Sequence, residues 1–173
     1  MKNTIFFALL FLSVCHSSFG QTTDSLNDKL VGYWKLESVK FKVPVDINKD
    51  GVKSADAMDE YTDCQKDQEL ELSEDMTAKI YSGTHAKDCK GQELQYKWKV
   101  VKRTVRDSRY DNGKRIINDH VVLVLMLKST SSNDSQQFLI DKVSKKSLNL
   151  KAELRDGSDS TSEAEEVYKK AKK

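Results

Sequence analysis

Apolar and polar side chains alternate with a period of two along much of this 173-residue chain. The clearest run covers residues 94–100, where Leu, Tyr, Trp and Val occupy every second position and Gln or Lys stands between them. An amphipathic helix has an apolar period near 3.6, whereas a strand with one buried face has a period of two. The chain is therefore constrained to fold mainly as β-sheet with one apolar face.

About eight such runs are separated by short polar turns. Residues 73–75 form one hairpin signal, and the Asn112-Gly113 pair forms a stronger one because both residues accept a positive φ. Short strands with little helix are typical of an antiparallel sandwich or barrel. We expect an all-β fold, a single antiparallel up-and-down β-barrel of about eight strands, which has room inside for side chains or one small ligand. The expected strands are residues 33–45, 69–72, 76–80, 94–100, 116–128, 136–140, 148–154 and 163–169, the last as a closing edge strand.

Two strands depart from simple alternation. Trp34 and Phe41 are both expected in the core but lie at opposite parities of one strand, which predicts a β-bulge near Ser38. Residues 121–127 are apolar at both parities, and a strand of that kind must be covered on both faces. We expect the N-terminal segment or a second chain to cover its outer face.

The polar stretches are assigned to connections. Residues 21–29 are expected to form a short polar segment with a single helical turn, and residues 52–63 a polar loop. Residues 101–110 are interpreted as a polar connection into the Asn112-Gly113 turn.

The first twenty residues have the organisation of a signal peptide. Lys2 precedes a short apolar run, well below the ~20 residues that span a bilayer, and a small-x-small triplet ends at Gly20. The expected mature chain is one exported domain over residues 21–173, periplasmic or extracellular. In the alternative, Cys15 belongs to a lipobox and carries a lipid anchor that holds the protein at a membrane.

Cys64 and Cys89 are the two cysteines of the expected mature chain. An even number of cysteines in an exported protein indicates a disulfide, worth roughly 3 kcal/mol. Two free thiols, or a metal pair with His85, are the alternatives. The formal net charge of the chain is only +2, which argues against a nucleic-acid binder, since such proteins carry a concentrated basic face.

The Gly32-Tyr33-Trp34 triplet at the start of the first strand matches the Gly-x-Trp signature of lipocalins. The chain resembles exported bacterial lipocalin-like proteins there and at residues 46–51, 63–67 and 138–150. The resemblance implies a β-barrel that binds a small apolar ligand. The chain departs from the animal lipocalin pattern because it lacks a Thr-Asp-Tyr motif, and Arg155 is the one candidate for the late arginine that packs on the signature tryptophan.

Eight apolar or aromatic residues have the parity expected to face the interior. They would line a pocket for a small apolar ligand, or they would fill a solid core. Trp34 in particular is expected to plug one end. The eight candidate ligand-binding residues are Trp34, Leu70, Leu72, Ile80, Tyr96, Trp98, Leu148 and Leu150.

The acidic loop after the first strand resembles the first half of an EF-hand. Oxygen ligands stand at alternate positions and are followed by Gly51, which predicts a structural Ca²⁺. The twelfth position is Ala57, so a carboxylate of Asp56, Asp59 or Glu60 would have to complete the shell. A plain Asn/Asp/Gly turn without metal explains the same residues. The candidate ligands are Asp46, Asn48, Asp50, Val52, Ser54 and Asp56.

Catalysis has little support in the sequence, and we expect no enzyme. His85 and His120 are the only histidines of the expected mature chain, and no nucleophile elbow surrounds a serine. Glu69 and Glu71 are interpreted as a solvated strand face. The expected function is binding of a small, apolar ligand. The alternative is a cell-envelope interaction scaffold with a solid core, a Ca²⁺-pinned loop, and a homodimer or partner contact through residues 121–127.

Overall fold

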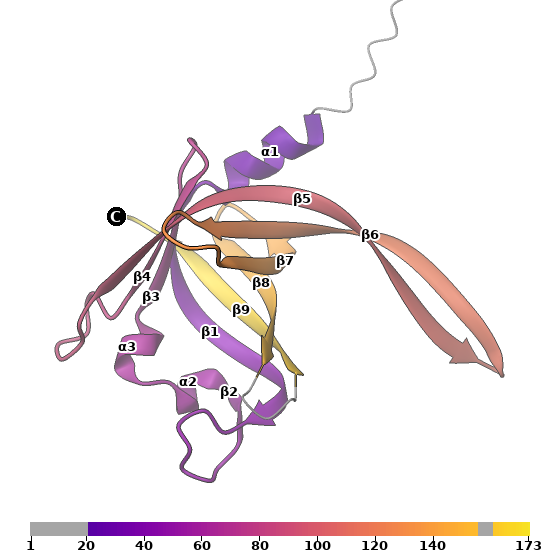
Figure 1. Cartoon of the computed structure of the whole chain (residues 1–173), viewed down its shortest axis with the longest axis horizontal. Helices are drawn as coiled ribbons and strands as arrows, with labels where there is room; N and C mark the ends of the chain where they lie inside the picture. Colours follow the sequence, from indigo (N-terminus) through magenta and orange to yellow (C-terminus); the bar gives the residue numbers. More distant parts are fainter. Residues whose placement is uncertain (1–20, 156–160) are drawn as a thin grey trace, which may run out of the picture.

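The structure, a computed structural model, describes residues 21–155 and 161–173. The leader predicted for residues 1–20, Cys15 included, and the turn expected at residues 156–160 lie outside the described residues. Eight strands hydrogen-bond in sequence order into a closed antiparallel ring, and a short additional strand pairs with the far end of the first (Figure 1). The ring consists of β1 (Gly32–Val45), β3 (Gln68–Leu72), β4 (Thr77–Ser82), β5 (Gln92–Asp111), β6 (Lys114–Ser129), β7 (Ser135–Val143), β8 (Ser147–Arg155) and β9 (Thr161–Ala171), with β2 (Ser54–Asp56) outside it.

The first and last strands close the ring. β1 pairs with β3 along its first residues and with β9 along most of its length, from Tyr33 opposite Ala171 to Phe41 opposite Ala164. β9 also pairs with β8, from Arg155 opposite Thr161 to Ser147 opposite Lys169. The prediction of an all-β fold with eight antiparallel strands is therefore confirmed. The strand expected at residues 163–169 closes the ring as predicted, but it is not an edge strand, because β9 has a neighbour on both sides.

The bulge predicted near Ser38 is present in β1. Leu36 lies opposite Tyr168 and Ser38 lies opposite Val167, so one residue of β1 is inserted between two consecutive partners. The insertion reverses the parity of the strand, which allows Trp34 before it and Phe41 after it to enter the same core.

Trp34, which was expected to plug one end of the barrel, lies in the core near the start of β1. Its side chain is fully buried, and its indole Nε1 donates a hydrogen bond to the carbonyl oxygen of Leu30 at 2.7 Å. Lys170 lies over the indole ring of Trp34, with its Nζ 5.1 Å from the centroid of the indole. The same Nζ donates to the carbonyl oxygen of Val31 at 2.8 Å. A Cβ on Gly32 would meet the Lys170 side chain at 2.5 Å, and φ of Gly32 is +147°. Glycine at this position thus lets the lysine reach the tryptophan.

The structure has more helix than was expected. α1 (Gln21–Leu30) is ten residues long and extends the single helical turn predicted there. The expected loop at residues 52–63 contains β2 and α2 (Ala57–Glu60), and α3 (Asp63–Lys66) begins at its last residue. No helix among the described residues is long and apolar enough to cross a membrane.

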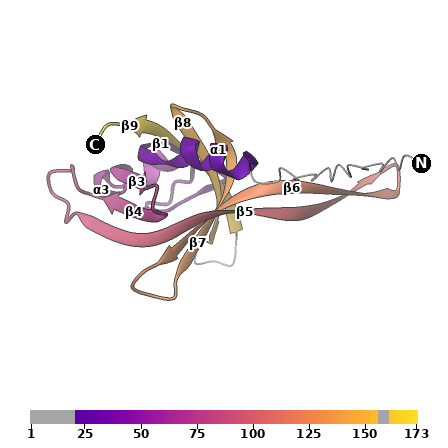
Figure 2. The same cartoon turned by 90° about the horizontal axis from the view of Figure 1, so that it is seen from above.

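The polar connection predicted at residues 101–110 is instead the second half of β5. β5 and β6 pair without interruption from Tyr96 opposite Ser129 to Asp111 opposite Lys114, and the Asn112-Gly113 turn joins them. Both turn residues have a positive φ, 49° and 75°, as the hairpin signal predicts. The outer half of this hairpin extends far from the rest of the ring in both views (Figures 1 and 2).

Candidate functional site

The projecting part of the β5–β6 hairpin is the feature that the ring does not use. Pairing of β4 with β5 ends at Thr77 opposite Lys97, and pairing of β6 with β7 ends at Val124 opposite Leu139. Beyond these points, within the part of the chain that the structure describes, the two strands pair only with each other. We call residues 102–123 the arm.

Every residue of the arm is exposed or half-buried. Large apolar side chains are among the exposed ones: Tyr110 keeps 75% of its surface in contact with solvent, Val121 65% and Ile117 51%. The core begins only two residue pairs below the arm, where Leu125 is fully buried. A two-stranded hairpin without cover is marginally stable in water, so a partner surface would stabilise the arm.

The arm is basic. It contains six Lys or Arg residues and three Asp residues, a formal net charge of +3. Arg106 and Asp119 form a bidentate cross-strand pair, with Nε to Oδ1 at 2.8 Å and Nη2 to Oδ2 at 3.0 Å. His120 Nδ1 lies 3.5 Å from Asp107 Oδ2 on the facing strand. These contacts use two of the three carboxylates inside the arm, which leaves an excess of positive charge for an external anion.

The structure brings the eight predicted ligand-binding residues together. Seven belong to the buried core, and Ile80 is partly buried and packs against it. Sequence parity thus located the interior correctly. Ligand contact by these residues remains a prediction.

A hollow of about 360 Å³ lies beside one of these residues at the base of the arm. It is lined by Trp98, Met126, Leu127, Asn133, Ser135 and by Lys97, Lys99 and Lys128. The indole Nε1 of Trp98 donates to the carbonyl oxygen of Ser73 at 3.0 Å, which holds the ring in place. Thus one predicted ligand residue lies at the edge of an apolar recess with a cationic rim.

The acidic loop forms turns through its own side chains. Asp46 Oδ2 accepts from the Gly51 N–H at 3.0 Å, and Asn48 Oδ1 accepts from the Asp50 N–H at 2.9 Å. Asp50 Oδ1 in turn accepts from the Val52 N–H at 2.7 Å. These are the contacts of the metal-free turn that was the alternative to a Ca²⁺ site.

The candidate ligands beyond the loop have other partners. Asp56 forms an ion pair with Lys40 and caps α2 through the Met58 N–H at 3.0 Å. The hydrogen bond from Lys40 is the largest cause that holds the pKa of Asp56 below its ordinary value. The hydrogen bond from the Met58 N–H and the charge of Lys40 act in the same direction. Ser54 Oγ donates to Asp59 at 3.0 Å. A Ca²⁺ at residues 46–56 stays a prediction.

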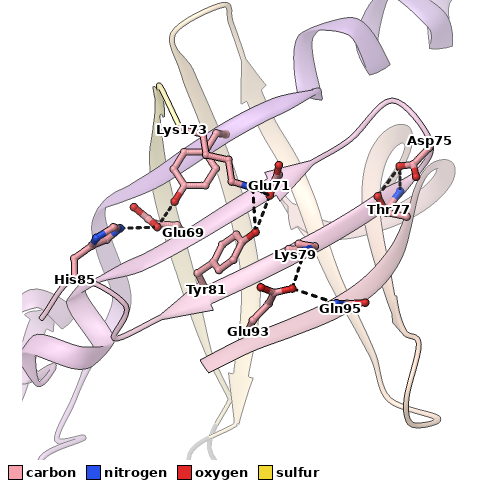
Figure 3. A network of polar contacts seen from close by, with 11 residues as sticks. Glu69, Glu71, Asp75, Thr77, Lys79, Tyr81, His85, Glu93, Gln95 and Lys173 are labelled. Atoms are coloured by element: carbon pink, nitrogen blue, oxygen red, sulfur yellow. Dashed lines mark hydrogen bonds and ion pairs between the residues drawn. The ribbon is translucent and has the colours of Figure 1, made fainter. Parts of the chain in front are cut away.

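A network of carboxylates and tyrosines covers the outer face of β3, β4 and β5 (Figure 3). Tyr81 and Lys173 both donate to Glu71 Oε2 at 2.8 Å, and Lys79 pairs with Glu93 at 2.8 Å. Burial works to raise the pKa of the Glu71 carboxyl, but the hydrogen bonds from Lys173 and Tyr81 outweigh it and the pKa lies below its usual value. Glu71 and Glu93 therefore each have a lysine partner.

Glu69 was interpreted as solvated, but it is buried at the edge of this network. It accepts hydrogen bonds from Tyr33 and faces His85 Nε2 at 3.2 Å. Burial, and then the bond to Glu69, raise the pKa of the Tyr33 hydroxyl well above its ordinary value. Tyr33 therefore remains a hydrogen-bond donor throughout the physiological range.

Asp67, Glu69 and His85 are the one group of three acidic, histidine or cysteine ligands that converges within the described part of the chain, with ligand atoms within 4.8 Å of one another. Such a set could hold a divalent cation. Asp67 Oδ2, however, already accepts from the N–H groups of His85 at 2.5 Å and Ala86 at 3.2 Å. The group therefore also has a structural role, because it anchors the loop after β4.

The predicted disulfide between Cys64 and Cys89 is confirmed and fastens the same loop to α3. Gly83 lies against it: a Cβ there would meet Cys89 Cβ at 2.9 Å, and φ of Gly83 is +64°. The disulfide suits an oxidising compartment. His85 lies on this loop and His120 on the arm, each beside its own carboxylate.

No family model, curated protein or solved structure matches this chain. The function of the chain is therefore inferred from the geometry of the chain itself. Sequence reasoning missed the β5 half of the arm, residues 102–110, because a strand that is solvated on both faces has no apolar stripe; the β6 half lies within the strand expected at residues 116–128. The one available signal was the Asn112-Gly113 turn, with β-branched residues on both sides of it.

Proposed function

We propose that this chain is an exported, non-enzymatic interaction module, a lipocalin-like ring with a solid core, whose arm binds a partner protein. The observation that carries the proposal is the arm itself: a hairpin with exposed Tyr110, Ile117 and Val121, supported at its base by the ring and uncovered beyond it. Exposed apolar side chains that lie together on a projecting hairpin are typical of interaction sites. This function is the scaffold alternative that the apolar residues 121–127 suggested.

A protein surface fits the arm better than the interior of a lipid bilayer does. Among the described residues, neither edge of the arm has a strand neighbour beyond the ring, so backbone N–H and C=O groups face outward there. Such groups cannot enter hydrocarbon without a large cost, whereas a protein partner supplies hydrogen bonds to them. The basic charge then favours an acidic partner over a neutral one.

Photo-crosslinking tests the proposal. A photoreactive amino acid at Tyr110, at the tip of the arm, is compared with one at Val52, which is 65% exposed on the body of the protein. We expect a protein adduct from exported material of the source cells at the first position only. Unlabelled protein should reduce the yield of this adduct by competition. A shortened variant should not compete; in this variant an Asn-Gly turn replaces residues 103–122. Equal competition by the shortened variant would refute the proposal.

The hollow beside Trp98 favours a second function, binding of a small apolar ligand as the resemblance to lipocalins implies. Trp98, Met126 and Leu127 supply an apolar lining. A hydrophobic probe should quench tryptophan fluorescence in the wild type and in Met76→Glu, a control at an exposed methionine outside the hollow. Met126→Glu should abolish the quenching. Quenching that survives in Met126→Glu would exclude the hollow as the site.

A further inference from the structure

The two edges of the arm can be assigned residue by residue. In an antiparallel strand, successive residues direct their backbone N–H and C=O groups to opposite sides. The Trp98 N–H donates to the Met76 carbonyl at 2.9 Å, so even-numbered residues of β5 face away from β6. The Ser129 N–H donates to the Asp134 carbonyl at 2.9 Å, so odd-numbered residues of β6 face away from β5.

The register of the hairpin is unbroken from its base to its turn, so the same alternation continues into the arm. Thr104 and Ser108 therefore direct backbone groups to the free edge of β5. Ile117, Asp119 and Val121 direct theirs to the free edge of β6. Thr104 lies directly opposite Val121, so each edge has one such residue at the same height along the arm.

The β6 edge is the better docking edge. It continues the edge that β7 occupies in the ring as far as Val124, so a strand added there would extend an existing sheet from the point where β7 leaves it. Its outward-facing residues include Ile117 and Val121, which are more than half exposed. At the same heights on the β5 edge stand Ser108 and Thr104, which are polar.

The charge of the arm selects the occupant. A second arm paired edge to edge would bring two segments of net charge +3 together, and like charges on neighbouring strands destabilise a sheet. Resting on the function proposed above, we propose that the free edge of β6 between Ile117 and Val121 binds an extended, acidic segment of a different protein by strand addition. Backbone hydrogen bonds provide affinity, and Arg and Lys side chains of the arm select acidic residues.

Fluorescence anisotropy with a labelled peptide in which Val and Glu alternate tests this mode on the full-length mature protein. The wild type should bind it, and should bind a counterpart with Lys in place of Glu at least about tenfold more weakly. Val121→Pro removes one outward N–H without touching the β5–β6 bonds, and should weaken binding about tenfold. Thr104→Pro is the matched control on the opposite edge and should bind as the wild type does. Val121→Thr, which keeps the N–H, separates the backbone from the side chain and should retain binding.

Each other outcome decides against the proposal. Absence of peptide binding to the wild type, equal binding by Val121→Pro, or equal loss in Val121→Pro and Thr104→Pro overturns the assignment to the β6 edge. If the arm-dependent crosslink persists in any of these cases, the proposed function stands and only strand addition fails. If the peptide does not bind but anionic phospholipid vesicles retain the wild type and not the shortened variant, the arm is a membrane-surface site instead.

Discussion

A pair of alanine substitutions on β6 tests where the ring ends and the arm begins. Leu125 is fully buried in the core, whereas Val121, four residues further out on the same face of β6, is 65% exposed. Deletion of a buried leucine side chain costs the transfer free energy of the lost atoms and the energy of the cavity, about 3 kcal/mol within a range of about 2–5. Val121→Ala loses only strand propensity at an open position, below about 1 kcal/mol.

Equilibrium unfolding in urea measures both changes with one probe. Trp34 and Trp98 are the two tryptophans of the chain, and both are buried, so their fluorescence reports on the ring. With a denaturant slope of about 2 kcal/mol/M, Leu125→Ala should lower the urea midpoint by about 1.5 M and Val121→Ala by less than about 0.5 M. A Val121→Ala loss as large as that of Leu125→Ala would show that the arm is packed in solution, and the interaction argument would fail. Midpoints at several protein concentrations control for self-association.

The other predictions concern the disulfide, a buried carboxyl and the acidic loop. The Cys64→Ser/Cys89→Ser double variant should lose about 3.5 kcal/mol of unfolding free energy in the same urea assay, because the bridge closes a loop with a sequence separation of 25 residues; an unchanged midpoint would refute this. Burial raises the pKa of the Glu166 carboxyl above 4.5, although the hydrogen bond from Tyr168 opposes this shift. The contribution of Glu166 to the stability of the fold therefore falls as pH rises through the raised pKa. Glu166→Gln should therefore raise Tm at about pH 7 and leave it unchanged at about pH 4, and a gain of equal size at both pH values would contradict the cause. If Ca²⁺ binds residues 46–56, Ca²⁺ should raise Tm in the wild type and not in Asp50→Asn, a variant that keeps the oxygen for the Val52 N–H; an equal rise in both would place the ion elsewhere.

Sequence periodicity could predict the ring because each of its strands has one buried face. The bulge near Ser38 was predictable for the same reason, since Trp34 and Phe41 demand the same core from opposite parities. The alternation of apolar and polar residues cannot predict a strand when neither face of that strand is buried. The outer half of β5 is such a segment: it is a strand because β6 pairs with it, and that pairing follows from the Asn112-Gly113 turn.

The helices and the ligand cluster required other signals. α3 begins with the pattern Thr62-x-x-Gln65, in which the Gln65 side chain accepts from the Thr62 N–H at 2.9 Å, a capping pattern that is visible in the sequence. Asp67, Glu69 and His85 could not be grouped in advance. His85 reaches the two carboxylates because the Cys64–Cys89 bridge and the hydrogen bonds to Asp67 fold its loop back on β3.

The apolar residues of β6 have two different roles along one strand. From Val124 to Leu127 the strand has neighbours on both edges, and Leu125 and Leu127 belong to the core. Val121 lies beyond the last residue of β6 that pairs with β7, and its apolar side chain is exposed to solvent. Folding of the ring does not require an exposed valine there, because charged edge residues protect a free strand from aggregation better. A binding partner that covers Val121 would explain why an apolar residue is exposed there. The positive charge of the surrounding arm restricts which chains can act as that partner.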